Sequence, residues 1–219
     1  MEERKLAQIE QDLRAFFDLE GFKYQSPQKA GDEEALMLEM KALGRQARSA
    51  FKYLVERLDQ LDLGLFPVRV SNWMNQAQVI RPAFYAYFRP LEASQSLPAM
   101  ALRLYRQGQA IGISWEVSVL ERKKDPASYD RLHRHLQKPA PATMSYKVFY
   151  QEEARIDWLS HGERDQNLLQ AQLKNGQISR IWLVAPIGLL KDFEDTETWL
   201  KKAQAIYWDL YPYYLLTCD

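Results

Sequence analysis

The spacing of the apolar residues changes at residues 63–67 from a helical period to a two-residue period. Before this point, apolar side chains recur at every third or fourth position, which is typical of amphipathic helices. From Val68 onward, short segments rich in β-branched and aromatic residues alternate apolar with polar side chains, which is typical of strands. The sequence therefore predicts a helical N-terminal region followed by a region that consists mainly of strands.

Two helices are predicted in the N-terminal region. The first has apolar residues at helical spacing from Leu6 to Phe17, and Gly21 marks its end. The second covers residues 32–62 and would be about 45 Å long. Packing of the two as a helical hairpin is favoured, and a dimer interface is the alternative. The apolar positions of the second helix have nearly the spacing of a heptad repeat: Leu36, Met40, Leu43, Ala47, Ala50, Leu54, Leu58 and Leu61.

About half of this seam extends beyond the first helix, which would be only about 25 Å long. The apolar face of the sheet can cover the remainder. A second copy of the chain can also do so, because Ala47 and Ala50 permit close approach of another helix. Coverage within one chain costs less translational entropy than association of two chains. We therefore expect a monomer rather than a homodimer.

The clearest strand signal is a hairpin over residues 100–123 that turns at residues 107–109. A two-residue loop, at Gln107-Gly108 or at Gly108-Gln109, keeps the apolar residues of both strands on one face. This apolar set is Met100, Leu102, Leu104, Ile111, Ile113 and Trp115. The opposite face then carries Arg103, Tyr105, Ser114, Glu116 and Ser118.

The remaining sequence alternates short helices with strands. We predict a helix at residues 128–137, a strand at 145–150 and a helix that starts at Ser160 and ends at Gly176. A buried strand at 178–184 and a last helix follow. The fold class is α+β: a helical hairpin (residues 1–63), then a largely antiparallel sheet with helices packed on one face (residues 64–219). The two parts are expected to form one compact unit.

Composition excludes several classes of protein. The 219 residues are 47% apolar and 26% charged, which excludes a disordered or low-complexity chain. The single cysteine, Cys218, excludes an internal disulfide framework. No apolar run approaches the roughly 20 residues that a membrane span requires, and the N-terminus has no apolar signal segment. A soluble cytoplasmic protein without a membrane partner is expected.

The formal net charge of zero conceals an uneven distribution. Residues 64–147 carry a net charge of +7, whereas residues 1–63 carry −3 and residues 148–219 carry −4. A basic central segment can form a surface for an anionic partner. The alternative is that acidic helices fold onto the basic sheet and neutralise it.

Two segments, residues 68–76 and 81–90, interleave arginine with aromatic and amide side chains. Aromatic rings stack on bases, arginine pairs with phosphates or base edges, and amides read base edges. We therefore predict a non-enzymatic nucleic-acid-binding or accessory protein. In the alternative interpretation, the aromatic residues are core and the arginines pair with acidic flanks. The predicted nucleic-acid contacts are Arg69, Trp73, Asn75, Arg81, Arg89 and Arg103.

An enzymatic alternative rests on Glu121 and Lys123, which follow an apolar strand with the E-x-K spacing of PD-(D/E)xK nucleases. In that chemistry the carboxylate holds Mg²⁺ and the lysine positions the attacking water. A third acid would come from Glu116 or Glu92. A further alternative is a small-ligand or protein-interaction module. Its aromatic pocket would be lined by Trp73, Tyr85, Tyr87 and Trp115.

Other motifs of known chemistry are missing from the sequence. It contains no G-x-x-x-x-G-K-[ST], G-x-G-x-x-G, G-x-S-x-G or H-E-x-x-H segment. His133 and His135 would point about 200° apart on a helix, so they cannot share a metal ion there. Both are expected to be solvent-exposed. Apart from magnesium in the nuclease alternative, no cofactor is predicted.

The arginine-aromatic segments, the strand with Trp115 and Glu116, and the ending Tyr-Pro-Tyr-Tyr-Leu-Leu-Thr resemble a known group of proteins. That group is a family of uncharacterised cytosolic proteins from low-GC Gram-positive bacteria, and the resemblance covers most of the chain from Leu65 onward. It implies no activity and no particular site residues. Residues 68–73 and the following aromatic strand are also similar to the DNA-binding N-terminal modules of McrB-type restriction systems.

Overall fold

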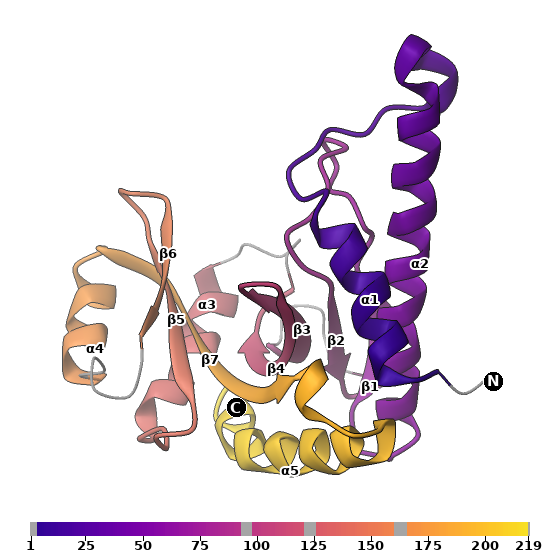
Figure 1. Cartoon of the computed structure of the whole chain (residues 1–219). Helices are drawn as coiled ribbons and strands as arrows, with labels where there is room; N and C mark the ends of the chain where they lie inside the picture. Colours follow the sequence, from indigo (N-terminus) through magenta and orange to yellow (C-terminus); the bar gives the residue numbers. More distant parts are fainter. Residues whose placement is uncertain (1–3, 93–97, 121–125, 160–165, 219) are drawn as a thin grey trace.

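The computed structural model describes residues 4–92, 98–120, 126–159 and 166–218, and it has the expected α+β architecture (Figure 1). Helix α1 (Leu6–Phe17) lies antiparallel beside the longer α2 (Glu34–Asp59), so the predicted helical hairpin is confirmed. Two short 3-10 turns, at Pro27–Lys29 and Gly31–Glu33, lead into α2. In the described part of the chain, no helix combines the length and the apolar character needed to cross a membrane.

The described strands form one sheet in which all neighbours are antiparallel, as predicted. The strand that comes last in the sequence lies between the fourth and the fifth strands. It joins the hairpin of the fifth and sixth strands to the rest of the sheet. From one edge to the other the strands are β1 (Phe66–Val70), β2 (Tyr85–Arg89), β3 (Ala99–Gln107), β4 (Ala110–Ser118), β7 (Ile178–Leu189), β5 (Ser145–Tyr150) and β6 (Arg155–Leu159).

The hairpin of β3 and β4 has the predicted register. Gln107 pairs with Ala110, so the loop is the two-residue Gly108-Gln109. Gly108 has φ +62°, a left-handed conformation that glycine adopts without strain. Leu102 pairs with Trp115, and both lie on the face that the helices cover, which we call the inner face. We call the opposite face the outer face.

The inner face packs against α1, α2 and α5 (Thr196–Leu215). The ring of Phe84 lies 5.1 Å from that of Phe16 and 6.0 Å from that of Phe51, measured between centroids. On α5, the backbone carbonyl of Ala203 accepts a 3.0 Å hydrogen bond from the indole of Trp115. These contacts bury the helical hairpin, the sheet and the C-terminal helix in one hydrophobic core.

The remaining helices pack at the end of the sheet where β4 stops. Helix α3 (Pro126–Leu132) continues into a 3-10 turn, His133–Gln137, and α4 (Gln166–Lys174) precedes β7. Both contact β7. A further 3-10 turn, Leu190–Asp192, connects β7 to α5.

The half of α2 that extends beyond α1 is covered by loop residues rather than by the sheet. Trp73, 8% exposed, lies against Gly44, and its ring meets that of Tyr24 edge-on at 5.0 Å. The backbone N–H of Gln25 contacts the sulfur of Met37 at 3.4 Å. Met40, Ala47 and Ala50 of the seam are therefore buried within the chain, whereas Leu36, at the start of the seam, is 39% exposed and Leu43 is partly buried. The covering element differs from the one predicted, and the monomeric state stays a prediction.

Gly44 makes this packing possible, and replacing it is expected to destabilise the protein. A Cβ at this position would lie 2.5 Å from the Trp73 ring. Helix propensity alone would favour Gly44→Ala by about 1 kcal/mol, but overpacking of this kind costs about 1–3 kcal/mol. We expect a net loss of stability in urea unfolding. The control Ala42→Gly, at an exposed position of α2, measures the propensity contribution. A Gly44→Ala protein more stable than wild type would contradict the packing.

Candidate functional site

Polar and aromatic side chains collect on the outer face of the sheet. Strand pairing places Arg103 and Ser114 on this face. Glu116, two residues after Ser114 on β4, lies on the same face, as predicted. Lys147 of β5 pairs with Trp182 of β7 and with Trp158 of β6, so these three residues also share a face. The contact between Lys147 and Glu116 shows that it is the outer face.

The sheet curls toward its outer face. Tyr105 and Trp158 belong to β3 and β6, which are four strand spacings apart, or about 19 Å in a flat sheet. Their ring centroids are nevertheless only 6.5 Å apart. Tyr105 also lies directly over Gly112, where a Cβ would meet the ring at 2.2 Å. The outer face is therefore concave, and its own side chains bury its centre.

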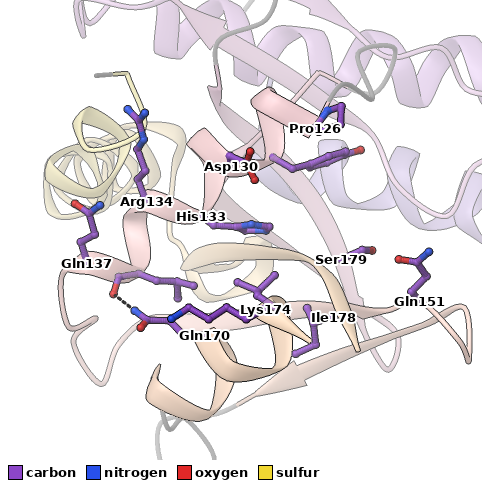
Figure 2. Close-up of a pocket in the computed structure, with 13 residues that line it drawn as sticks. Pro126, Asp130, His133, Arg134, Gln137, Gln151, Gln170, Lys174, Ile178 and Ser179 are labelled. Atoms are coloured by element: carbon purple, nitrogen blue, oxygen red, sulfur yellow. Dashed lines mark hydrogen bonds between the residues drawn. The ribbon is translucent and has the colours of Figure 1, made fainter. Parts of the chain in front are cut away.

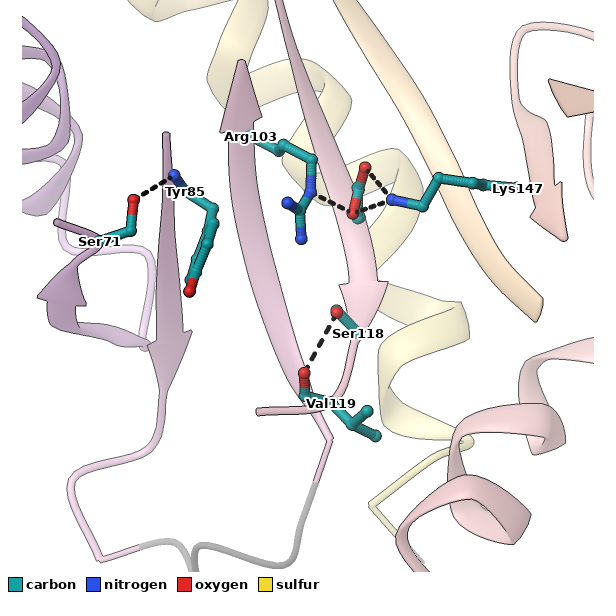
Figure 3. A network of polar contacts seen from close by, with 7 residues as sticks. Ser71, Tyr85, Arg103, Ser118, Val119 and Lys147 are labelled. Atoms are coloured by element: carbon teal, nitrogen blue, oxygen red, sulfur yellow. Dashed lines mark hydrogen bonds and ion pairs between the residues drawn. The ribbon is translucent and has the colours of Figure 1, made fainter. Parts of the chain in front are cut away.

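Glu116 occupies this centre with no exposed surface. The Arg103 Nε donates a 2.8 Å hydrogen bond to one carboxylate oxygen, and the Lys147 Nζ lies 2.8 Å from both oxygens (Figure 3). Burial by itself would raise the pKa of Glu116, but the charges and hydrogen bonds of Arg103 and Lys147 hold it below its usual value. The carboxylate is therefore ionised and shared by two cations.

Lys147 is enclosed on its remaining sides. Its Nζ lies 4.9 Å from the ring centroid of Trp182 and 5.7 Å from that of Trp158. Trp182 is 9% exposed, whereas Trp158 is 49% exposed and forms the outer edge of this cluster. Burial lowers the pKa of Lys147 from 10.5 to about 8; Glu116 opposes this shift and Arg103 adds to it.

Three of the arginines predicted to bind nucleic acid lie at the other side of the outer face. The guanidinium carbons of Arg103 and Arg81 lie 4.9 Å and 5.6 Å from the ring centroid of Tyr85. The hydroxyl of Ser71 accepts a hydrogen bond from the backbone N–H of Tyr85 at 3.1 Å (Figure 3). Arg89, two residues beyond Tyr87 on β2, is 5% exposed, and burial lowers its pKa.

The structure separates the other predicted contacts from this group. Arg69 is exposed on β1. Trp73 packs on α2 as core, and this correction arises because only a large ring fills the space above Gly44. Asn75 is exposed and closes a local turn, since its side-chain oxygen accepts a 3.0 Å hydrogen bond from the backbone N–H of Val79.

The acidic helices neutralise only part of the basic segment. Arg106 lies 3.6 Å from Asp18, at the end of α1, and donates a 3.0 Å hydrogen bond to the carbonyl of Phe17. Arg103 instead pairs with Glu116, an acid of the sheet itself. The central cations are therefore not uniformly matched to acids from the helices.

The residues of the nuclease alternative are only partly described. Glu121 and Lys123 lie outside the described residues. Glu116 is enclosed by two cations, and Glu92 is exposed after β2. Within residues 4–92, 98–120, 126–159 and 166–218, no three His, Cys, Asp or Glu side chains are grouped so as to hold a metal ion.

The predicted aromatic pocket is not formed, because its members lie on different faces. Trp73 and Trp115 belong to the main core, whereas Tyr85 and Tyr87 form a separate buried cluster with Ala99 and Ala101. The alternation of residues 84–88 left both orientations open for these tyrosines. Packing of Phe84 and Phe88 into the core places Tyr85 and Tyr87 outside.

A groove of about 910 Å³ lies between α3 with its 3-10 turn, α4 and the start of β7 (Figure 2). Its volume is in the range of small-molecule sites. Sequence reasoning missed it because its walls come from separate segments. Polar lining residues include Asp130, Arg134, Gln137, Gln151, Gln170 and Lys174.

Of the two histidines near this groove, His135 is buried and His133 is half-buried, which corrects the prediction that both are exposed. His133 Nε2 accepts a 3.2 Å hydrogen bond from the backbone N–H of Ile181 and joins the 3-10 turn to β7. His135 has no exposed surface, and its Nδ1 contacts the carbonyl of Leu132. Burial lowers the pKa of each histidine to about 4. The turn of 3-10 helix directs both rings toward the sheet, an orientation that a regular helix would not give.

Sequence reasoning missed Lys147, Trp158 and Trp182 as site residues. Alternation within residues 145–150 assigns Lys147 to a face, but it does not say which strand lies beside it. No family model and no curated protein matches this sequence, so the family resemblance and the McrB-type similarity stay predictions.

The carboxylate at the centre of the outer face is expected to be strongly coupled to Lys147. Glu116→Gln leaves a buried ammonium without its counter-charge, a change that costs about 3–5 kcal/mol. Lys147→Met is expected to be similarly destabilising. The double variant Glu116→Gln/Lys147→Met should lose much less than the two single losses combined, as measured by urea unfolding. Additive losses would show that the two groups are not coupled.

Stability is expected to fall between pH 6.5 and pH 4 because of the buried His135. The folded-state pKa of His135, about 4, lies below the unfolded value of 6.5, so the unfolded chain binds more protons in this window. Its contribution is complete above pH 6.5. By pH 5 about 2 kcal/mol of it is lost. Urea unfolding at pH 7 and pH 5 measures this difference. His135→Phe should reduce it, and an unchanged difference in that variant would contradict the assignment.

Proposed function

We propose that the protein binds single-stranded nucleic acid in the concave outer face of its sheet. The observation that carries the proposal is the pairing of cations with aromatic rings across this face. Arg81 and Arg103 lie against Tyr85 at one side, and Lys147 lies against Trp158 and Trp182 at the other.

The charge of the outer face suits a polyanion. Arg89, Arg103 and Lys147 point outward from the described strands, and Arg180 lies 4.7 Å from the ring of Phe149 on the same face. Together with Arg81, these are five cations. Among the outward-facing strand residues that the structure describes, Glu116 is the one carboxylate, and two of the cations already neutralise it. Among the described residues of this face, cationic side chains therefore outnumber carboxylates, a composition that suits phosphates.

The shape of the face favours a single strand over a duplex. The half-exposed ring of Trp158 offers a surface on which an unpaired base can stack, and such stacking is worth about 1–3 kcal/mol per base. A base in a duplex is already stacked and cannot use this ring. The buried centre, with Arg103 and Lys147, would then lie beneath the backbone of the bound strand.

Binding to labelled oligonucleotides tests the proposal. We expect fluorescence anisotropy to show binding of single-stranded DNA or RNA, weaker binding of the matching duplex, and affinity that falls linearly with salt on logarithmic axes. Trp158→Ala should weaken binding about tenfold or more. Its control, Trp208→Ala, removes a ring of similar exposure, 48%, from α5 on the other side of the molecule and should leave affinity unchanged.

The arginines provide a second comparison. Arg81→Gln should weaken binding and reduce the salt dependence, whereas Arg45→Gln, at an exposed position of α2, should change neither. Absence of binding to DNA and to RNA, each as a single strand and as a duplex, at low salt would refute the proposal. Gel analysis of the same strands after incubation with Mg²⁺ tests the nuclease alternative, which requires cleavage that Glu121→Ala abolishes.

A further inference from the structure

The amine of Lys147 has surroundings that a purely structural ion pair does not require. Its Nζ faces both oxygens of Glu116 at 2.8 Å and lies between two indole rings, and a second cation, Arg103, binds the same carboxylate. Ser114, on the same strand face as Glu116, carries a buried hydroxyl for which the described residues supply no hydrogen-bond partner. This polar cluster lies directly under the half-exposed ring of Trp158.

These surroundings make a neutral amine accessible near neutral pH. Removal from water and a neighbouring cation both disfavour the ammonium form, and the same two influences activate lysine nucleophiles. With a pKa of about 8, about a fifth of the amine is neutral at pH 7.4, against about a thousandth at 10.5. The proton that the ammonium releases passes to water, because the pKa of Glu116 is held below its usual value and its carboxylate stays ionised.

We infer that Lys147 is a nucleophilic amine that condenses with the aldehyde of an abasic sugar in a bound nucleic-acid strand. The inference rests on the proposed function, which places a strand on this face. An abasic sugar in its open form is the position in such a strand that presents an aldehyde. Because its base is missing, it does not compete for the ring of Trp158, and the proposal places the neighbouring phosphates near Arg103 and Arg81, the arginines that lie against Tyr85.

The step is balanced by the amine, the aldehyde and water. The ammonium of Lys147 releases a proton to water, and the neutral amine forms a C–N bond to the aldehyde carbon while its N–H proton moves to the oxygen. The carbinolamine that results takes up one proton from water and loses its oxygen as a water molecule, which leaves a protonated imine between Lys147 and the sugar, beside the Glu116 carboxylate. No oxidant or reductant takes part.

Borohydride trapping tests this step. A strand with one uracil, freed of that base by uracil-DNA glycosylase, is incubated with the protein and reduced with borohydride, which converts an imine to a stable amine. We expect a covalent complex that peptide mapping assigns to Lys147. Lys147→Arg keeps a cation beside Glu116; at a protein concentration where anisotropy shows this variant bound to the intact strand, it should form no covalent complex. Lys201→Arg, at an exposed position of α5, should trap like wild type.

The outcomes separate the two proposals. Binding of the intact strand without a trapped complex, or with adducts only at exposed lysines such as Lys201, would overturn the role of Lys147 and leave the proposed function standing. Failure of both strands to bind would overturn the proposed function and the abasic substrate with it. Reductive labelling of the wild-type protein with glyoxylate needs neither a strand nor a variant. It should modify Lys147 at least tenfold faster than Lys201, and an equal or slower rate would refute the reactive amine.

Discussion

The burial of one carboxylate constrains the centre of this sheet. Glu116 has no contact with water, and an isolated charge in that position would cost several kcal/mol. Arg103 comes from the neighbouring strand β3, but Lys147 comes from β5 and reaches Glu116 past the intervening β7. The pair therefore closes only if β4, β7 and β5 keep their observed register, and the bulge at Ile187 of β7, opposite Ile113 and Ser114, contributes to the curl that brings them together.

Successive side chains of β4 point alternately to the inner and the outer face, and so enter two different environments. Trp115 faces inward and binds α5, while Glu116, the next residue, faces outward into the charged network. The inner face supplies the hydrophobic burial that holds the helical hairpin and the C-terminal helix. The outer face needs no covering helix over its centre, because its curl allows Tyr105, Trp158 and Trp182 to enclose the charges. The hydrophobic core and the charged network thereby occupy opposite sides of the same strands.

Local patterns in the sequence predicted those parts of the fold that depend on neighbouring residues. The two-residue turn at Gly108 set the register of β3 on β4, and so placed Arg103 and Glu116 together correctly. Lys147 could not be placed in this way, since its position depends on β7 entering the sheet between β4 and β5, a pairing of segments about 35–70 residues apart. The core position of Trp73 had one available signal, a glycine at position 44 within an otherwise strong helix.

The energetic cost of the charged network bears on its role. Apolar side chains of similar volume hold strands together at least as well as a buried ion pair does, and often better. The outer face nevertheless carries Glu116, Lys147 and Arg103, together with a buried hydroxyl of Ser114 that has no hydrogen-bond partner in the described residues. Stability alone does not require these groups, and the proposed binding and reaction give the three charged groups a role. In the proposed reaction with a bound strand, Arg103 meets phosphate, Glu116 faces the positively charged imine, and Lys147 bonds to carbon.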